Sequence, residues 1–232
     1  MLLSILIPTL ENRRALFGRV QGQLAAQVAA AGLEAEVEIL DCRDNGEQTT
    51  GWKRNRLLER AQGEFVAFVD DDDTVSDDYV PRICRAIRSH PGIDCIGIRG
   101  VVSFRGGHPR EFVHSTRYSD YRSCDGVYQR PPYHLNPIRR SIAAQYQFAD
   151  VYYSEDIDWA RSMARDKVLR VECFIDSVLY YYACRRPWIY QWALDHTETV
   201  RHSLGLRLDN RLRLRRFFER VCARGTCANA TR

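Results

Sequence analysis

The sequence has few lysines and no closely spaced pair of cysteines. Lys53 and Lys167 are the only lysines among 34 basic residues, so arginine carries nearly all of the positive charge. The eight cysteines form no C-x-x-C pair and have no cluster of histidines beside them, which argues against a structural zinc site. Several of them lie in apolar runs, where cysteine behaves as a small core residue. This pattern favours an intracellular chain with reduced thiols.

Long apolar runs are also missing. No stretch reaches the roughly 18 residues that a membrane span requires. The apolar start, MLLSILIPTL, has no basic leader and no small-residue cleavage site, so it reads as a first strand. A net charge of +4 is too small to indicate nucleic acid as a partner by itself. From these absences we expect a cytoplasmic protein without a membrane span.

What the sequence does contain is a regular alternation of strands and helices. Apolar runs predict strands, and amphipathic segments between them predict helices. The predicted strands are 2–10, 36–40, 64–69 and 93–104, and the predicted helices are 11–31, 50–63 and 76–90. The predicted fold class is therefore α/β, with a single Rossmann-like, mostly parallel sheet flanked by helices. In such sheets ligands bind beyond the carboxyl ends of the strands.

The rest of the chain is less regular. We expect a polar loop at 41–50, a partly antiparallel extension over 105–150, a helix over 154–166 and one or two strands over 171–183. Ser76 and Ser154 are predicted helix N-caps, and Gly32 is a predicted C-terminal stop. We expect one domain over 1–197. An Arg-rich C-terminal extension, helical and then frayed, is expected over 198–232.

The main polar feature is a run of four aspartates, Asp70, Asp71, Asp72 and Asp73, directly after the apolar segment EFVAFV. Carboxylates this close repel one another, and burial removes their water. The run is either a solvated turn or a site for something cationic. Asp70 and Asp72, at i and i+2, can aim at one cation, and Mg²⁺ or Mn²⁺ bridging to a diphosphate would explain the concentration of charge.

Several segments occur together in a telling order: SILIPTL, EILDCRDNG, GWKRNRLLERAQGEFVAFVDDDD and SDDYV, followed further on by SEDIDW. This ordered set resembles family 2 glycosyltransferases of the GT-A fold, over residues 3 to about 90 and again at the last segment. The resemblance implies transfer of a sugar from a nucleoside-diphosphate sugar, with UDP as the family's default nucleotide and Mn²⁺ or Mg²⁺ as cofactor.

The resemblance also implies roles for residues on the donor side. Pro8 and Thr9 would line the nucleotide pocket, and Asp41 or Asp44 would hydrogen-bond the uracil or ribose. Arg54 and Asn55 match an "RN" pair beside the nucleotide. Asp70 and Asp72 match a D-x-D signature, with Asp72 the first candidate for a metal ligand and Asp71 and Asp73 the next. Asp70 and Asp71 are also expected to lie beside the donor.

On the acceptor side, the pair Glu155 and Asp156 matches the family's "ED" pair, with Asp156 as general base of an inverting transfer. The segment YHLNPIRRSI implies that His134, Asn136 and Arg139 lie near the sugar. His196 or His202 is a candidate third metal ligand. The aromatic segment 180–192 is either a lid over the diphosphate or an edge of the core with snorkelling arginines.

We therefore expect a metal-dependent inverting glycosyltransferase that uses a UDP-sugar. The acceptor hydroxyl is left open between a glycan, a lipid-linked glycan and a hydroxylated DNA base, DNA being the less favoured partner. One alternative is a nucleotidyltransferase on a similar sheet, although PTLENRR lacks the glycines that such enzymes favour after the first strand. The other is a non-catalytic nucleic-acid-binding module, which the acidic run disfavours.

Overall fold

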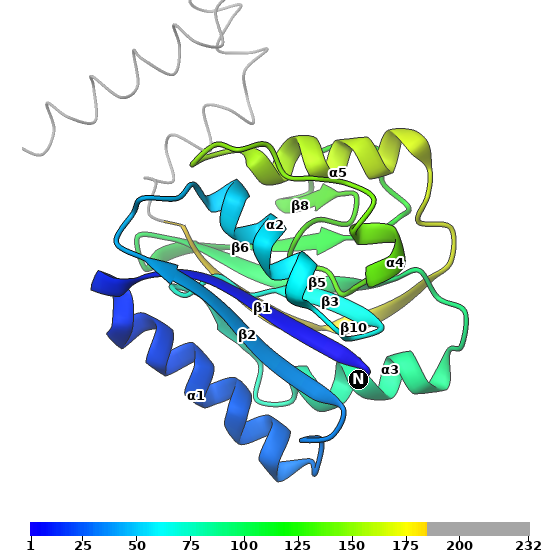
Figure 1. Ribbon diagram of the computed structural model, residues 1–232. Coiled ribbons are helices and arrows are strands. Elements are labelled where there is room, and N and C mark those ends of the chain that lie inside the picture. The colour runs from blue at the N-terminus through cyan, green and yellow to red at the C-terminus, as the bar shows by residue number, and fades with distance from the viewer. Residues whose placement is uncertain (185–232) are drawn as a thin grey trace, which may run out of the picture. The chain divides into compact units, whose positions relative to one another are not determined.

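The computed structural model describes residues 1–184, which form an α/β unit (Figure 1). The strands are β1 (Leu3–Leu10), β2 (Val37–Asp44), β3 (Phe65–Phe68), β4 (Thr74–Val75), β5 (Cys95–Phe104), β6 (Gly107–His114), β7 (Arg122–Cys124), β8 (Val127–Arg130), β9 (Ile138–Arg139) and β10 (Glu172–Cys184). The helices are η1 (Glu11–Arg13), α1 (Arg14–Ala30), α2 (Thr50–Arg60), α3 (Tyr79–Ser89), α4 (Arg140–Ala143) and α5 (Glu155–Asp166).

One sheet joins all these strands. Its order is β2-β1-β3-β9-β5-β6-β8-β7, with β10 alongside β5 and β4. The longest pairings, β1 with β2 and β5 with β10, are parallel, whereas β6, β7 and β9 form the antiparallel part that was expected between residues 105 and 150. The α/β fold class with a mostly parallel sheet is thus confirmed. The segment expected to be one or two strands over 171–183 is the single strand β10.

Helices cover both faces of this sheet. In Figure 1, α1 and α3 lie on one face, and α2, α4 and α5 lie on the other. Because β1 and β3 are covered on both sides, every residue of β3 and nearly every residue of β1 is buried, which explains their continuous apolar runs. The carboxyl ends of β1, β2 and β3 lie side by side, so the polar segments that follow them meet at one edge.

Three local predictions need correction or refinement. The loop expected from residue 41 is wrong at its start, because parallel pairing with β1 continues β2 as far as Asp44. Ser76 is not an N-cap: α3 begins at Tyr79, and the Ser76 hydroxyl donates to the carboxylate of Asp78, 3.0 Å away. Ser154 does occupy the N-cap position of α5, but its side chain makes no capping hydrogen bond.

Gly32 ends α1 in the left-handed conformation (φ 62°), as predicted. Within residues 1–184, no helix is both long and apolar enough to cross a membrane. The predicted domain boundary at 197, the Arg-rich extension, most of the aromatic segment 180–192, and both His196 and His202 lie outside the described residues.

Candidate active site

The four aspartates after β3 alternate between buried and half-exposed positions. Asp71 and Asp73 are 1% and 0% exposed. The side chains of Asp70 and Asp72 keep 24% and 23% of their exposure. The run is therefore not a solvated turn. Its second and fourth carboxylates belong to the interior, and its first and third face the open edge.

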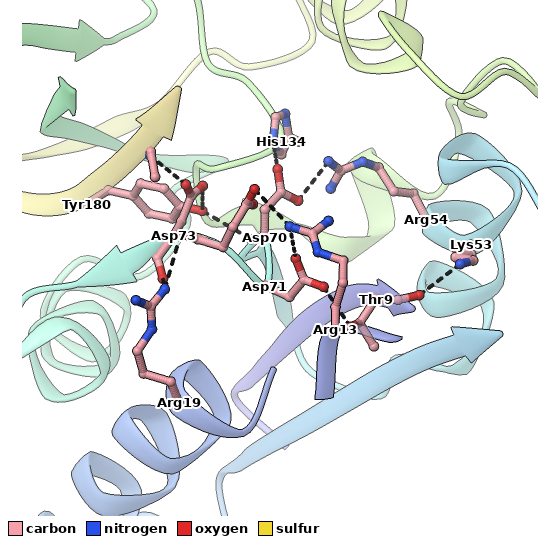
Figure 2. Close-up of polar contacts among 12 residues, drawn as sticks. Thr9, Arg13, Arg19, Lys53, Arg54, Asp70, Asp71, Asp73, His134 and Tyr180 are labelled. Carbon is pink, nitrogen blue, oxygen red and sulfur yellow. Dashed lines mark hydrogen bonds and ion pairs between the residues drawn. The ribbon is translucent and has the colours of Figure 1, made fainter. Parts of the chain in front are cut away.

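Arginines from the first helical segment neutralise and hold this acidic turn. Arg13, at the end of η1, places Nη2 2.7 Å from Asp71 Oδ1 and 2.8 Å from Asp72 Oδ2 (Figure 2). Arg19, six residues further along on α1, donates to the backbone carbonyls of Asp72 and Asp73 at 3.2 and 3.3 Å. The cations beside the run are thus guanidinium groups of this chain.

The buried carboxylates have further partners within the protein. Thr9 donates its hydroxyl hydrogen to Asp71 at 2.6 Å. Asp73 accepts from the Tyr180 hydroxyl and the Ala183 backbone N–H, both at 2.8 Å. Burial raises the pKa of Asp71, and burial together with the charge of Asp70 raises the pKa of Asp73 well above its usual value.

Arg54, on α2, joins the acidic turn to the start of α5. Its guanidinium donates to Asp70 Oδ1 at 2.9 Å and to Glu155 Oε1 at 3.0 Å, and it lies over the Phe68 ring at 5.0 Å. Burial alone would raise the pKa of Asp70, but Arg54 and His134 hold it well below its usual range. Burial raises the pKa of Glu155, although Arg54 opposes that effect.

His134 lies between the two acidic segments. Its Nε2 is 3.6 Å from Asp70 Oδ2, and its Nδ1 is 3.2 Å from Asp156 Oδ2. The His134 carbonyl accepts a hydrogen bond from the Phe68 N–H at 3.1 Å, which fixes this segment at the end of β3. Burial favours a higher pKa for Asp156, but the contact with His134 and the charge of Arg54 lower it to about 2. Asp156 is thus a carboxylate at neutral pH.

A second polar group lies at the ends of β1 and β2. Lys53 is buried, donates to the Thr9 carbonyl at 2.8 Å and forms a close ion pair with Asp44. Asp44 also accepts from the backbone N–H groups of Gly46 and Gln48. Burial opposes ionisation of Asp44, but these partners lower its pKa below the usual value. Asp41 lies within β2, 3.5 Å from the Arg43 guanidinium.

Three predicted site residues, Pro8, Asn55 and Asn136, are part of the fold around the site. Pro8 is buried within β1. Asn55 pairs with both backbone groups of Phe148 at 2.9 Å. Asn136 is buried, accepts from the Tyr133 N–H and donates to the Ile96 carbonyl.

Arg139 is at the opposite end of β3 from the acidic turn. It pairs with Phe65, the first residue of that strand, and its guanidinium donates to the Ile93 carbonyl and to Glu64. The expectation that Arg139 lies near the sugar, beside His134, therefore disagrees with the structure. The segment 134–139, which ends in β9, runs from one end of β3 to the other.

Sequence reasoning missed Arg13, Arg19 and Lys53, and it placed Tyr180 only within the segment 180–192, which was expected to be either a lid or an edge of the core. A signal was available for Arg13 and Lys53, because both lie in polar segments next to the carboxyl ends of β1 and β2. Four adjacent carboxylates require counter-charges, and the basic residues nearest that edge are the first to consider. Tyr180 carried no comparable signal, because its pairing with Asp73 depends on how β10 packs.

The side chains of Asp70, Asp72 and Arg54 fit a divalent cation that is shared with a diphosphate. Among residues 1–184 no three His, Cys, Asp or Glu side chains lie together as a group of metal ligands. These residues therefore do not form a metal site that is complete without a further ligand. Asp70 and Asp72 still offer two half-exposed carboxylates, and hard divalent cations keep positions open for phosphate oxygens. Nη1 of Arg54 is buried without a hydrogen-bond partner in the described chain, which suits an anionic ligand beside Asp70.

The fold and the acidic edge together define a class of protein, one with a GT-A fold. In structural comparison the chain is similar to residues 1–349 of TarS from Staphylococcus aureus in complex with UDP-GlcNAc, with a TM-score of 0.53 and 17% identity over 80% of this chain and 59% of that one. The same fragment in complex with UDP matches with a TM-score of 0.51, at 17% identity over 79% and 60% of the two chains. At this identity the likeness shows a shared fold.

The sequence comparisons give the family. The model of glycosyl transferase family 2 matches residues 26–146, just over half of the chain, and the chain belongs to this family. A curated relative, the poly(ribitol-phosphate) β-N-acetylglucosaminyltransferase TarS of S. aureus, is 26% identical over 162 residues. That match covers 66% of this chain but only 26% of the relative, so this chain spans about a quarter of the relative's length.

Proposed function

We propose that this protein is an inverting glycosyltransferase that moves a sugar from a UDP-sugar to an acceptor hydroxyl, using Mn²⁺ or Mg²⁺. The observation that carries the proposal is the convergence of Asp70 and Asp156 on the two ring nitrogens of His134. A transferase of this kind needs a donor-side acidic group and an acceptor-side base at neighbouring positions, and these two carboxylates come from segments far apart in the sequence.

Asp156 is the proposed general base. The acceptor oxygen attacks the anomeric carbon, the bond from that carbon to the diphosphate oxygen breaks, and UDP leaves with the electron pair. The hydroxyl proton passes to the Asp156 carboxylate. One displacement inverts the anomeric centre. The pKa of Asp156 is about 2, so the residue is an ionised carboxylate across the neutral range, although the lowered pKa also makes it a weaker base.

Asp70 and Asp72 are the proposed metal-holding carboxylates. A divalent cation bound there would stabilise the negative charge of the diphosphate leaving group. Arg54 lies 2.9 Å from Asp70 and helps to lower its pKa, which keeps this carboxylate ionised. The TarS complexes with UDP-GlcNAc and UDP support a uridine donor, since that protein has the same fold. The sugar and the acceptor stay open, with glycans, lipid-linked glycans and hydroxylated DNA bases as candidates.

The donor proposal is tested by titrating UDP and UDP-GlcNAc into the protein by calorimetry, with and without Mn²⁺. We expect binding that requires the metal and is lost in Asp72→Asn. The control is Asp77→Asn, an exposed aspartate just beyond the acidic turn, which should bind as the wild type does. Absence of binding for both nucleotides, with and without Mn²⁺, would overturn the donor assignment.

The base is tested separately with Asp156→Asn. We expect this variant to bind UDP with unchanged affinity and to lose transfer to any acceptor that the wild type uses, with at least a hundredfold lower rate. Asp158→Asn, an exposed residue on the same helical turn, is the matched control and should keep its rate. Full turnover in Asp156→Asn would remove this residue from the role and make Glu155 the next residue to test.

A further inference from the structure

We propose that Arg13 is an internal counter-cation of the acidic turn, which a divalent cation has to displace from Asp72. The inference rests on the proposed function, because it concerns the same pair of metal-holding carboxylates. It adds that the donor-free protein already holds a cation at this position, and that this cation is an exchangeable arginine.

The contacts of Arg13 are those of a bridging charge. Its Nη2 lies 2.7 Å from a carboxylate oxygen of Asp71 and 2.8 Å from one of Asp72, so one terminal nitrogen faces two carboxylates. The Nε and Nη2 atoms of Arg13 are buried and make no well-directed hydrogen bond within residues 1–184. Charge, rather than a directed hydrogen-bond network, therefore keeps the guanidinium in place.

Arg54 provides the contrast within the same site. It donates directed hydrogen bonds to Asp70 and Glu155, lies over the Phe68 ring and is only 3% exposed. Arg13 keeps a quarter of its side-chain exposure, and within residues 1–184 no aromatic ring lies beneath its guanidinium. Of the two arginines, Arg13 is the more exposed and lacks directed hydrogen bonds, so it is the easier one to displace.

The surrounding residues can keep their arrangement when Arg13 leaves. Asp71 keeps the hydrogen bond from Thr9, and Arg19 still holds the carbonyls of Asp72 and Asp73. Asp72 has a half-exposed side chain, so a cation arriving from the solvent side can reach it. Asp71 is 1% exposed and loses the cation beside its Oδ1, so the cation that arrives at Asp72 has to offset that charge as well.

The consequence is that the divalent cation and the donor diphosphate favour each other's binding. With Arg13 in place, a divalent cation approaching Asp72 meets a like charge, so the nucleotide-free protein should bind metal weakly. A donor diphosphate adds negative charge at this edge and favours the exchange. Metal and nucleotide would then bind together more readily than either binds alone.

The test measures Mn²⁺ binding without nucleotide, from the free Mn²⁺ signal in electron paramagnetic resonance. For Arg13→Gln we expect a Kd about tenfold lower than that of the wild type, because the competing charge has been removed. Arg13→Lys keeps the charge and should stay within about twofold of the wild type. Arg14→Gln alters the neighbouring arginine, which pairs with Glu11 and is largely exposed, and should also stay within about twofold of the wild type.

A second readout covers an unstable variant. Mn²⁺ should raise the melting temperature of Arg13→Gln more than that of the wild type. Equal or weaker Mn²⁺ binding by Arg13→Gln, or no binding by either protein, would overturn the inference. This result is independent of the donor assignment: failure of the proposed function appears as missing UDP binding, whereas the Mn²⁺ measurement contains no nucleotide.

Discussion

Removing Arg54 should destabilise the protein strongly, because this one side chain compensates two carboxylates. Arg54→Met keeps much of the side-chain volume and the contact with Phe68 but removes the guanidinium. Glu155 is then a buried carboxylate without a cation, and Asp70 loses its closest ion pair. Breaking a buried ion pair by removing one partner costs about 3–5 kcal/mol.

The size of the effect follows from the exposure of the two partners. Glu155 is 5% exposed at the side chain, so its uncompensated charge carries nearly the full cost. Asp70 is 24% exposed and can recover some hydration. We therefore expect Arg54→Met to lose about 3 kcal/mol of unfolding free energy. In a protein of this length that loss lowers the melting temperature by roughly 6–12 °C.

The assay is urea denaturation at pH 7 without nucleotide or metal. Arg56→Met is the matched control on the same helix, because Arg56 pairs with Glu59 in an exposed contact and should cost less than about 1 kcal/mol. Adding Glu155→Gln to Arg54→Met should restore part of the loss, since the buried charge is gone. A loss below about 1 kcal/mol for Arg54→Met would refute the view that the guanidinium compensates both carboxylates.

Two further predictions concern packing and pH. In Gly51→Ala the new Cβ would lie 1.8 Å from the Ala149 carbonyl oxygen, so we expect a loss of about 2 kcal/mol in urea denaturation. Gly18→Ala, in open space on α1, should instead stabilise by about 0.5–1 kcal/mol. Asp156 has a pKa lowered from 3.8 to about 2 in the folded protein, so its stabilising contact with His134 is present above pH 4 and is lost as the pH falls toward 2. The stability gap between wild type and Asp156→Asn should therefore shrink by about 2 kcal/mol between pH 4 and pH 2, and a constant gap in urea midpoints would contradict this.

The part of the fold that surrounds the acidic edge could be read from the sequence. The apolar runs at β1 and β3 are continuous because both strands are covered on two faces, and such runs are visible without a structure. The polar segments after them were therefore placed correctly at one edge. β2 was predicted too short because its second half is polar, and only the pairing with β1 shows that the strand continues to Asp44.

The candidate site was predictable in its acidic residues and not in its basic ones. The pattern of carboxylates is local in sequence, so Asp70 and Asp72 could be separated from Asp71 and Asp73 by their i, i+2 spacing. Their counter-charges are not local. Arg13 and Arg54 lie on other elements, and their contacts depend on how η1 and α2 pack against the end of β3.

The segment around His134 shows the same limit. His134, Asn136 and Arg139 are close in sequence, and one role near the sugar was expected for all three. In the structure His134 faces two carboxylates, and Arg139 lies at the far end of β3. Asn136 bonds to the Tyr133 N–H, the Ile96 carbonyl and the His114 ring. An irregular segment has no fixed period, so spacing alone does not tell which of its side chains face a site.

The distribution of charge explains how an acidic edge can be stable before any ligand arrives. The buried Asp73 accepts a hydrogen bond from the Tyr180 hydroxyl, and Asp70 pairs with Arg54. Arg13 bridges the carboxylates of Asp71 and Asp72. Stability without ligand therefore does not require a metal, and a folded protein in metal-free solution says nothing about metal use. The arginines at this edge differ in whether an incoming cation can displace them. Fixed arginines maintain the fold, whereas an arginine that is held by charge alone can give its place to an incoming cation.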